Sequence, residues 1–157
     1  MAAQNKPSGY GNVVEPCTVI LFGASGDLAK RKVIPAMFDL AIHKALGARY
    51  AIIGFSRTAM TDESFRSTIG EAAKTISEVG PIDPQQWSEF ASNLYYSPGD
   101  YGKPESYAEL AKRLKEIRDA KDLGGNLLFY ISTPPEVYRD IVEQIGKAGL
   151  NKPSKRR

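Results

Sequence analysis

The sequence predicts a doubly wound α/β fold, in which helices cover both faces of a mostly parallel sheet. Four short apolar segments, rich in β-branched or aromatic residues, alternate with longer segments of helical periodicity. The first apolar segment runs directly into a glycine turn and a helix, which is how a nucleotide-binding βαβ unit begins. Together these observations predict a Rossmann-type domain with right-handed crossovers and its ligand at the carboxyl ends of the strands.

The length and composition fit one domain. The chain has 157 residues, 42% of them hydrophobic and 25% charged, so a single sizeable core is expected. We assign this domain to residues 16–150, between a flexible polar leader at 1–15 and a basic tail at 151–157. The tail holds four positive charges, and without them the net charge of +3 becomes −1. The body therefore lacks the basic surface typical of nucleic-acid binding, and we expect no nucleic-acid partner.

The single cysteine and the single histidine argue against two classes of site. Cys17 starts an apolar strand and has no second cysteine to pair with, which predicts a buried, inert thiol in a reducing compartment. His43 lies in a predicted helix without another His or Cys nearby, so no zinc site is expected. The N-terminus lacks a secretory signal, and no apolar run reaches the about 18 residues of a membrane span. We expect a cytoplasmic protein that does not bind membranes.

The first strand, turn and helix follow from local patterns. The run TVILF (18–22) predicts a strand buried on both faces, and the glycines within 23–26 force a tight turn. Apolar residues at mostly helical spacing predict a helix over about 28–46. Because Pro35 has no backbone donor and clashes with the preceding turn, we expect a kink or a break near Ile34.

The same alternation continues along the rest of the domain. Gly47 ends the first helix, and Thr61 and Asp62 are of the types that cap helix N-termini. Gly80-Pro81 breaks the following helix, and Thr133-Pro134-Pro135 ends the last strand. The expected elements are a strand over 50–55, a helix to residue 76, a short helix at 84–91, a strand at 93–97, a helix at 105–118, a strand at 127–132 that is again apolar throughout, and a helix at 136–147.

The glycine turn has the pattern G-x-x-G-x-x-A, formed by Gly23, Gly26 and Ala29. It departs from the usual G-x-G-x-x-G fingerprint and lacks the Gly-Lys-Ser/Thr of a P-loop, so the pattern alone is weak. Its position between a buried strand and a helix favours a dinucleotide site, because the glycines admit a pyrophosphate and the helix start offers unpaired N–H groups. A plain strand-to-helix turn is the structural alternative.

Arg57 indicates which dinucleotide the turn would hold. The second strand ends in Ser56-Arg57-Thr58, with no carboxylate before Asp62. NAD-specific sites place Asp or Glu there for the ribose hydroxyls, whereas a planar guanidinium can pair with a 2′-phosphate. The sequence therefore favours NADP, with an ordinary surface arginine as the structural alternative.

Two other features have simple structural explanations. Lys30, Arg31 and Lys32 form a basic cluster that is typical of a solvated helix face, although one of them can reach an anionic ligand near the turn. Thr133-Pro134-Pro135 stands where a nicotinamide ring would border the sheet, but two prolines also make an ordinary strand end. We favour the strand end.

Three blocks of the sequence are similar, in order and spacing, to one enzyme family. FGASGDLAKRKVIPAMFDL (22–40), GFSR (54–57) and LFYISTPPEVY (128–138) closely resemble the N-terminal domain of the glucose-6-phosphate dehydrogenase family. The resemblance covers roughly residues 17–150. It implies an NADP-dependent oxidoreductase of the pentose phosphate pathway, which oxidises the C1 hydroxyl of glucose 6-phosphate to 6-phosphogluconolactone and passes a hydride to NADP.

The same resemblance implies particular cofactor contacts. The residues from Gly23 to Lys30 match the family's dinucleotide turn, and Arg57 matches the arginine that binds the 2′-phosphate. Tyr138 is similar to a tyrosine that contacts the cofactor, and Lys32 to a lysine near the junction of cofactor and substrate. The implied cofactor-binding residues are Gly23, Ala24, Ser25, Gly26, Asp27, Leu28, Ala29, Lys30, Lys32, Arg57 and Tyr138.

The family extends further than this sequence. Its members continue into a strand ending in Glu-Lys-Pro, whose lysine binds substrate, and into a larger second domain that supplies the catalytic histidine. Both would lie beyond Arg157, together with the last strands of the first domain. We therefore expect no catalytic residue in this chain, which would bind NADP without turning over glucose 6-phosphate. The resemblance also implies that full-length members are homo-oligomers.

Two alternatives to this enzyme family stand beside it. Short-chain reductases can have similar glycine turns, but they use a Tyr-x-x-x-Lys pair, and none of the eight tyrosines here has a lysine four positions on. A non-catalytic nucleotide-binding or subunit-interaction module is the other alternative. It is kept open by the absent second domain and by an absent fifth strand, which would leave an unpaired sheet edge.

Overall fold

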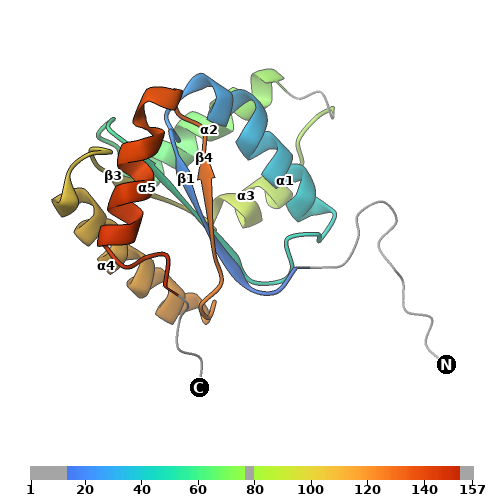
Figure 1. Cartoon of the computed structure of the whole chain (residues 1–157). Helices are drawn as coiled ribbons and strands as arrows, with labels where there is room; N and C mark the ends of the chain where they lie inside the picture. Colours follow the sequence, from blue (N-terminus) through green and yellow to red (C-terminus); the bar gives the residue numbers. More distant parts are fainter. Residues whose placement is uncertain (1–13, 77–79, 153–157) are drawn as a thin grey trace.

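Four parallel strands form the sheet, in the spatial order β3-β2-β1-β4 (Figure 1). The computed structural model describes residues 14–76 and 80–152, so most of the expected leader and of the basic tail lies outside the described residues. The chain crosses from one side of β1 to the other between β3 and β4, which confirms the doubly wound α/β prediction. The strands are β1 (Cys17–Phe22), β2 (Tyr50–Ser56), β3 (Leu94–Pro98) and β4 (Leu127–Ile131).

Helices cover the two faces of this sheet in two groups (Figure 1). Val19 and Leu21 of β1 point into the core under the first group, and Ile20 and Phe22 into the core under the second, so β1 is buried on both faces as predicted. The first group comprises the π-helical turn η1 (Ala29–Val33), α1 (Ile34–Ile42), α2 (Asp62–Ile76) and α3 (Pro84–Ala91). The second comprises α4 (Pro104–Lys121) and α5 (Tyr138–Lys147), which follows the 3₁₀ turn η2 (Pro135–Val137).

The helix after the glycine turn changes from π-helical to α-helical near Ile34, where the sequence predicts a kink or a break, and it is shorter than predicted. The π-helical turn η1 ends at Val33, and α1 starts at Ile34 with Pro35 in its first turn. Helical φ and ψ values continue through Val33 and Ile34, and the Ile34 N–H donates to the Ala29 carbonyl oxygen, so Pro35 is preceded by a π-helical turn and not by a break in the helix. The predicted end at residue 46 is wrong: α1 ends at Ile42, and Lys44, at φ 58°, leaves the helical conformation on the way to β2.

Thr61 caps α2 and Asp62 does not. Thr61 Oγ1 accepts the Ser64 N–H at 3.1 Å, and Ser64 Oγ accepts the Thr61 N–H at 2.9 Å, which is a reciprocal cap. The Asp62 carboxylate instead accepts the Tyr96 N–H at 2.8 Å and forms an ion pair with Arg113. Other observed boundaries differ slightly from the predicted ones. The strand β3 starts at Leu94, β4 ends at Ile131, α4 spans Pro104–Lys121, and the helix predicted at 136–147 is divided into η2 and α5.

The outer edge of β3 is covered by cationic side chains. Arg66 Nε donates to the Leu94 carbonyl oxygen at 2.8 Å. The charged groups of Arg66, Arg113 and Lys121 lie 5.3, 5.8 and 5.9 Å from the centre of the Tyr95 ring. Charged side chains that cover an outer strand oppose the pairing of a further strand, and here they come from α2 and α4.

At the other edge, β4 is covered on one face only. Phe129 packs against the core beneath α4 and α5. Leu128 and Tyr130 are in register with Val19 and Leu21 and therefore point toward the α1 side, where they are 52% and 41% exposed. A strand this apolar is expected to be buried on both faces. It is not, because the described helices on the α1 side pack against β1, β2 and β3.

Candidate dinucleotide-binding site

The segments that follow the four strands meet at the carboxyl edge of the sheet. The glycine turn follows β1, Arg57 follows β2, Tyr101 lies just beyond β3, and Thr133 just beyond β4. Backbone hydrogen bonds continue the sheet into this region, since Gly23 N donates to Phe55 O at 2.9 Å and Ser132 N donates to Phe22 O at 3.0 Å. The turn and Arg57, which the sequence predicts to act together, are therefore neighbours at this edge.

Gly23 permits the close approach between the turn and β4. Its φ is +80°, a conformation that side chains rarely adopt, and a Cβ there would lie only 2.4 Å from the Ser132 carbonyl oxygen. Glycine alone satisfies both conditions. The turn consequently packs against the end of β4, where the strand order reverses and doubly wound proteins bind their ligands.

The other turn residues divide into anchors and exposed groups. Ala24 and Ala29 are fully buried and hold the turn against the core. Gly26 N donates to Gly23 O at 2.9 Å and closes the turn. Lys30 is half-buried, and its N–H donates to Gly26 O at 3.2 Å. The helix thus starts directly at the turn, as a phosphate-binding site requires.

Asp27 and Leu28 are the exposed residues of the turn. The Asp27 carboxylate accepts a hydrogen bond from Arg31 Nε at 2.9 Å, and both side chains are largely exposed. This pairing offsets a negative charge that would otherwise oppose an approaching phosphate. Leu28 is 53% exposed and points away from the core.

A chain of hydroxyl groups, which the sequence did not reveal, ties the turn to the end of β2. Ser25 Oγ accepts hydrogen bonds from Ser56 Oγ at 2.7 Å and from Thr58 Oγ1 at 3.1 Å. Tyr96 of β3 lies with its hydroxyl 2.6 Å from Ser56 Oγ and donates to the Thr58 carbonyl oxygen at 2.6 Å. Burial raises the pKa of Tyr96, so its hydroxyl stays a donor at physiological pH. The two residues that flank Arg57 are therefore fixed relative to the turn.

Arg57 itself is exposed and lies over an aromatic ring. Its guanidinium carbon is 5.8 Å from the centre of the Tyr101 ring, within the range of a cation–π contact. Tyr101 is buried, and this burial raises the pKa of its hydroxyl. The positive charge of Arg57 and a backbone hydrogen bond at Gly23 oppose the rise without cancelling it. Tyr101 therefore touches both the arginine and the glycine turn. The only feature of the sequence that could have identified Tyr101 as a site residue is its position directly after the strand end at residues 97–100.

Thr133 has an unused hydrogen-bonding group beside the turn. Its side chain is buried, and Oγ1 has no partner among the described residues. Its methyl carbon would be 3.1 Å from a Cβ at Gly23. The Pro134-Pro135 segment does end the strand, as predicted, and leads into η2. Buried polar groups without partners are rare and often mark a place where a ligand or water binds.

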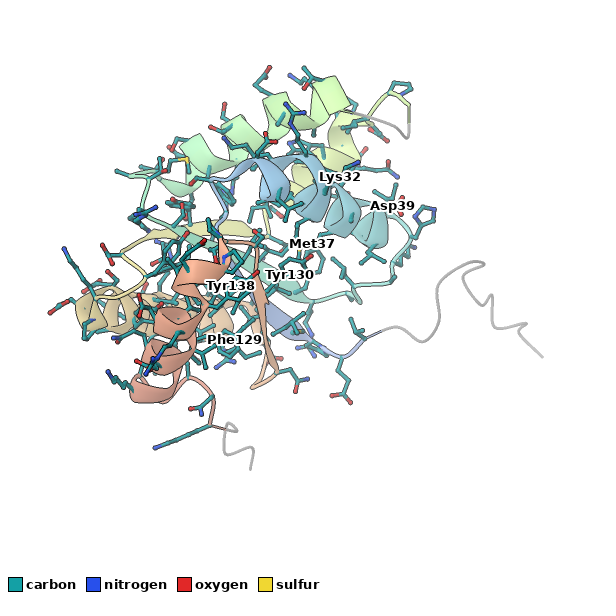
Figure 2. The ribbon with its side chains drawn as sticks, turned by 45° about the horizontal axis from the view of Figure 1, so that its top comes forward. Lys32, Met37, Asp39, Phe129, Tyr130 and Tyr138 are labelled. Carbon is teal, nitrogen blue, oxygen red and sulfur yellow. The ribbon has the colours of Figure 1, made fainter. Side chains whose placement is uncertain are left out.

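Lys32 and Tyr138 lie on opposite sides of β4 (Figure 2). Lys32 is in η1 and faces the α1 side of the sheet. Tyr138 begins α5 on the other side and is 42% exposed. Lys32 follows Gly26 of the turn by six residues, and Tyr138 follows the end of β4 by seven.

These residues fit a phosphorylated dinucleotide. The helix start at the turn suits a pyrophosphate, and the exposed guanidinium of Arg57 suits an additional phosphate. The strand end around Arg57 carries hydroxyl groups and no carboxylate. Thr133 provides an unpaired hydroxyl on the β4 side of the turn.

The remaining reactive side chains lie away from this edge. His43 is at the far end of α1, with Nδ1 2.8 Å from the Asp39 carbonyl oxygen. Cys17, predicted to be a buried and inert thiol, is half-buried, and burial raises the pKa of its thiol, which lowers its reactivity. Among residues 14–76 and 80–152 there is no group of three or more His, Cys, Asp and Glu side chains that could hold a metal ion. No helix in these ranges is long and apolar enough to cross a membrane.

Comparison with known proteins points to the family that the sequence resembles. The family described as "Glucose-6-phosphate dehydrogenase, NAD binding domain" matches residues 20–157. The chain is 38% identical over 138 residues to glucose-6-phosphate 1-dehydrogenase of Aggregatibacter actinomycetemcomitans, covering 88% of this chain and 27% of that protein. It is 36% identical over 147 residues to the Treponema pallidum (strain Nichols) enzyme of the same name, covering 94% and 28%.

Solved structures agree with these sequence matches. A glucose-6-phosphate dehydrogenase in complex with its substrate glucose-6-phosphate superposes with a TM-score of 0.75 and 31% identity, covering 89% of this chain and 29% of that one. Glucose-6-phosphate 1-dehydrogenase from Mycobacterium avium gives a TM-score of 0.74 and 28% identity, with 87% and 28% covered. The chain thus spans less than a third of the length of these relatives.

Proposed function

Because this chain belongs to the glucose-6-phosphate dehydrogenase family and spans its NAD-binding domain, we propose that it binds NADP for the oxidation of glucose 6-phosphate. Bound NADP would supply the hydride acceptor for that oxidation. The residues of this chain would bind and orient it: the turn from Gly23 to Lys30 at the pyrophosphate, Arg57 at the 2′-phosphate, and Tyr138 and Lys32 toward the nicotinamide half. Thr133 adds a hydroxyl donor on that side.

The preference for NADP rests chiefly on the surroundings of Arg57. Ser56 and Thr58 hold its backbone through Ser25, so its distance from the turn is fixed before a ligand binds. The guanidinium of Arg57 lies over the Tyr101 ring, and this contact helps to hold the side chain in place. A guanidinium held in this way can form two parallel hydrogen bonds with a phosphate, and it gains nothing from the bare ribose of NAD.

Calorimetric titration of the purified chain with NADP and with NAD tests this proposal. Replacing Arg57→Ala is expected to weaken NADP binding by roughly 10- to 100-fold, the usual effect of removing a charged hydrogen-bond donor, and to change NAD binding by less than about twofold. Arg49→Ala is the matched control. Arg49 precedes the same strand at the opposite edge of the sheet, where it pairs with Asp122, so both affinities should be retained. Equal losses for NADP and NAD in Arg57→Ala would show that Arg57 does not recognise the phosphate.

We propose further that the 157-residue chain binds cofactor without turnover, and that it works in the cytoplasm. Its one histidine, His43, lies at the far end of α1 from the glycine turn, so it cannot serve as a general base beside the cofactor. Glucose 6-phosphate and NADP mixed with the chain should yield no NADPH absorbance; steady NADPH formation would refute this. The free thiol of Cys17 is in keeping with a reducing cytoplasm.

A further inference from the structure

The packing of the fold does not account for the buried hydroxyl of Thr133. The residue is 8% exposed, and its Oγ1 has no hydrogen-bond partner among residues 14–76 and 80–152. A buried hydroxyl without a partner is energetically unfavourable, so such groups are rare in native proteins. In the described part of the chain, only Thr18 Oγ1 and Arg118 Nε share this condition.

Thr133 differs from the other two residues in its position. Thr18 lies near the start of β1, and Arg118 lies in the last turn of α4, which leads back to the start of β4. Thr133 lies just beyond the end of β4, at the carboxyl edge of the sheet. Its methyl carbon would be 3.1 Å from a Cβ placed on Gly23, so the side chain lies directly beside the glycine turn.

The order of the strands determines which half of a dinucleotide would reach Thr133. The strand β2, with Arg57 after it, lies on one side of β1, and β4 lies on the other. A dinucleotide in a doubly wound fold lies across the point where the strand order reverses. With its 2′-phosphate at Arg57 and its pyrophosphate at the turn after β1, the cofactor would extend its nicotinamide half over the end of β4.

The side chain of Thr133 can present its hydroxyl to that half by a single rotation. In this structure the methyl group faces the turn, and the hydroxyl is shielded from solvent. The two groups are similar in size, and a rotation of about 120° about the Cα–Cβ bond exchanges them between staggered positions. Pro134 restricts the backbone of Thr133 to extended conformations, so the side chain can turn without a change in the course of the chain.

We propose that Thr133 is a binding residue for the nicotinamide half of NADP, and that its hydroxyl turns toward that half when the cofactor binds. The hydroxyl donates to an oxygen of the nicotinamide ribose or of the phosphate joined to it, since these are the acceptors nearest to the pyrophosphate. The cofactor thereby supplies the partner that the described residues do not. The inference rests on the proposed function, because it names a contact within the same cofactor site.

Calorimetric titration with two ligands tests this contact. Adenosine 2′,5′-bisphosphate carries the adenosine, the 2′-phosphate and one further phosphate of NADP, but it lacks the nicotinamide riboside. Thr133→Val should weaken NADP binding by roughly 3- to 10-fold, the usual effect of losing one neutral hydrogen bond, and should leave binding of the bisphosphate within about twofold of wild type. Thr133→Ser keeps the hydroxyl and should retain the NADP affinity within about twofold. Arg57→Ala should weaken both ligands.

Thr18→Val is the matched control. Thr18 Oγ1 is also buried and without a partner in the described part of the chain, but it lies near the end of β1 that is farther from the turn. Removing either hydroxyl should leave the melting temperature of the chain unchanged or raise it, because neither hydroxyl has a hydrogen bond to lose. Only Thr133→Val should weaken NADP binding. A lower melting temperature for Thr133→Val would show that its hydroxyl already bonds to the protein, and would overturn the proposal.

Nuclear magnetic resonance measures the rotation directly. In the isotopically labelled chain, the three-bond coupling between the methyl carbon and the backbone nitrogen of Thr133 depends on its χ1 angle. This coupling should change when NADP is added and stay the same when the bisphosphate is added, whereas the coupling of Thr18 should stay the same with both. An unchanged Thr133 coupling in the NADP-bound chain would overturn the proposal.

The titrations also separate this proposal from the proposed function. A wild-type chain that binds neither ligand refutes the proposed function and the Thr133 contact with it. NADP binding that is weakened by Arg57→Ala but not by Thr133→Val refutes the Thr133 contact alone. Equal losses of NADP and bisphosphate affinity in Thr133→Val would assign the residue to the adenosine half, which also refutes the contact.

Discussion

The position of Arg57 is determined by its neighbours more than by its own side-chain contacts. Ser56 and Thr58 both donate to Ser25, and Tyr96 bonds the carbonyl of Thr58, so the backbone on each side of the arginine is tied to the turn. A side chain whose backbone is held in this way loses less conformational entropy when it binds a ligand. The proposed preference for a phosphate at this point therefore depends on hydroxyl groups from the glycine turn, from the end of β2 and from β3.

Gly23 leaves no room for a side chain. Gly23→Ala should lower the free energy of unfolding by about 2 to 4 kcal/mol, because the residue has a left-handed backbone and its new Cβ would overlap the Ser132 carbonyl. Gly146→Ala is the control, since Gly146 lies in α5 with open space around its Cα, and it should stabilise the protein by up to about 1 kcal/mol. Urea denaturation followed by circular dichroism measures both. A Gly23→Ala protein as stable as the wild type would mean that β4 can move away from the turn.

At this scale the sequence predicted some site residues and missed others for one physical reason. The turn residues and Arg57 lie directly after strands that are apparent from local pattern. Tyr101 and Thr133 acquire their roles from contacts with Gly23, which is distant in sequence. Only the sheet order brings them together, and no local pattern encodes which tyrosine or threonine will lie beside the turn.

Among the elements, the outer strand β3 is held by an ion pair that connects the two helical layers. Asp62 starts α2 on one face, Arg113 lies in α4 on the other, and the Asp62 carboxylate also accepts the Tyr96 N–H of β3. Both side chains are partly exposed, at 23% and 36% for Asp62 and Arg113, so water weakens the pair without removing its directional hydrogen bonds.

A double-mutant cycle measures this connection. Asp62→Ala and Arg113→Ala should each destabilise the protein, with a coupling free energy of about 1 kcal/mol from the shared contact. The exposed pair of Lys115 and Asp119, on the same helix as Arg113, should show no measurable coupling, because both of its side chains are largely in water. Equal coupling in the two cycles would indicate that the bridge between layers contributes no more than a surface pair.

The boundaries of elements show what local sequence can and cannot determine. Pro35 predicted an irregularity near Ile34, found as a π-helical turn, because the effect of a proline on a helix acts within one turn. The early end of α1 at Ile42 was missed because Leu46 continues the apolar pattern of the helix. Leu46 instead lies in the turn after α1, where it lines the same apolar pocket as Leu40. The exposure of alternate residues in β4 was missed for a related reason, because the sequence records that a face is apolar and not what covers it.

For the whole molecule, the sheet order sets the sequence in which contacts can form. The strands β2 and β3 follow β1 in sequence and lie in order on one side of it. On its other side β1 pairs with β4, which is distant in sequence: Ser132 donates a hydrogen bond to the carbonyl oxygen of Phe22, 110 positions earlier. Closing so long a loop is entropically unfavourable, so β4 should join the sheet late in folding. The contact between Gly23 and Ser132, and with it the cofactor site, is then completed after the main folding barrier.

This order of assembly has a kinetic consequence. A ligand that binds only the finished site stabilises the native state and leaves the transition state unchanged, so NADP should act on the unfolding rate alone. At an NADP concentration 100 times its dissociation constant, unfolding should slow by about 100-fold, while refolding stays within about twofold of its rate without ligand. Stopped-flow urea jumps in both directions measure the two rates. Faster refolding with NADP would show instead that β4 docks early and that the cofactor can take part in folding.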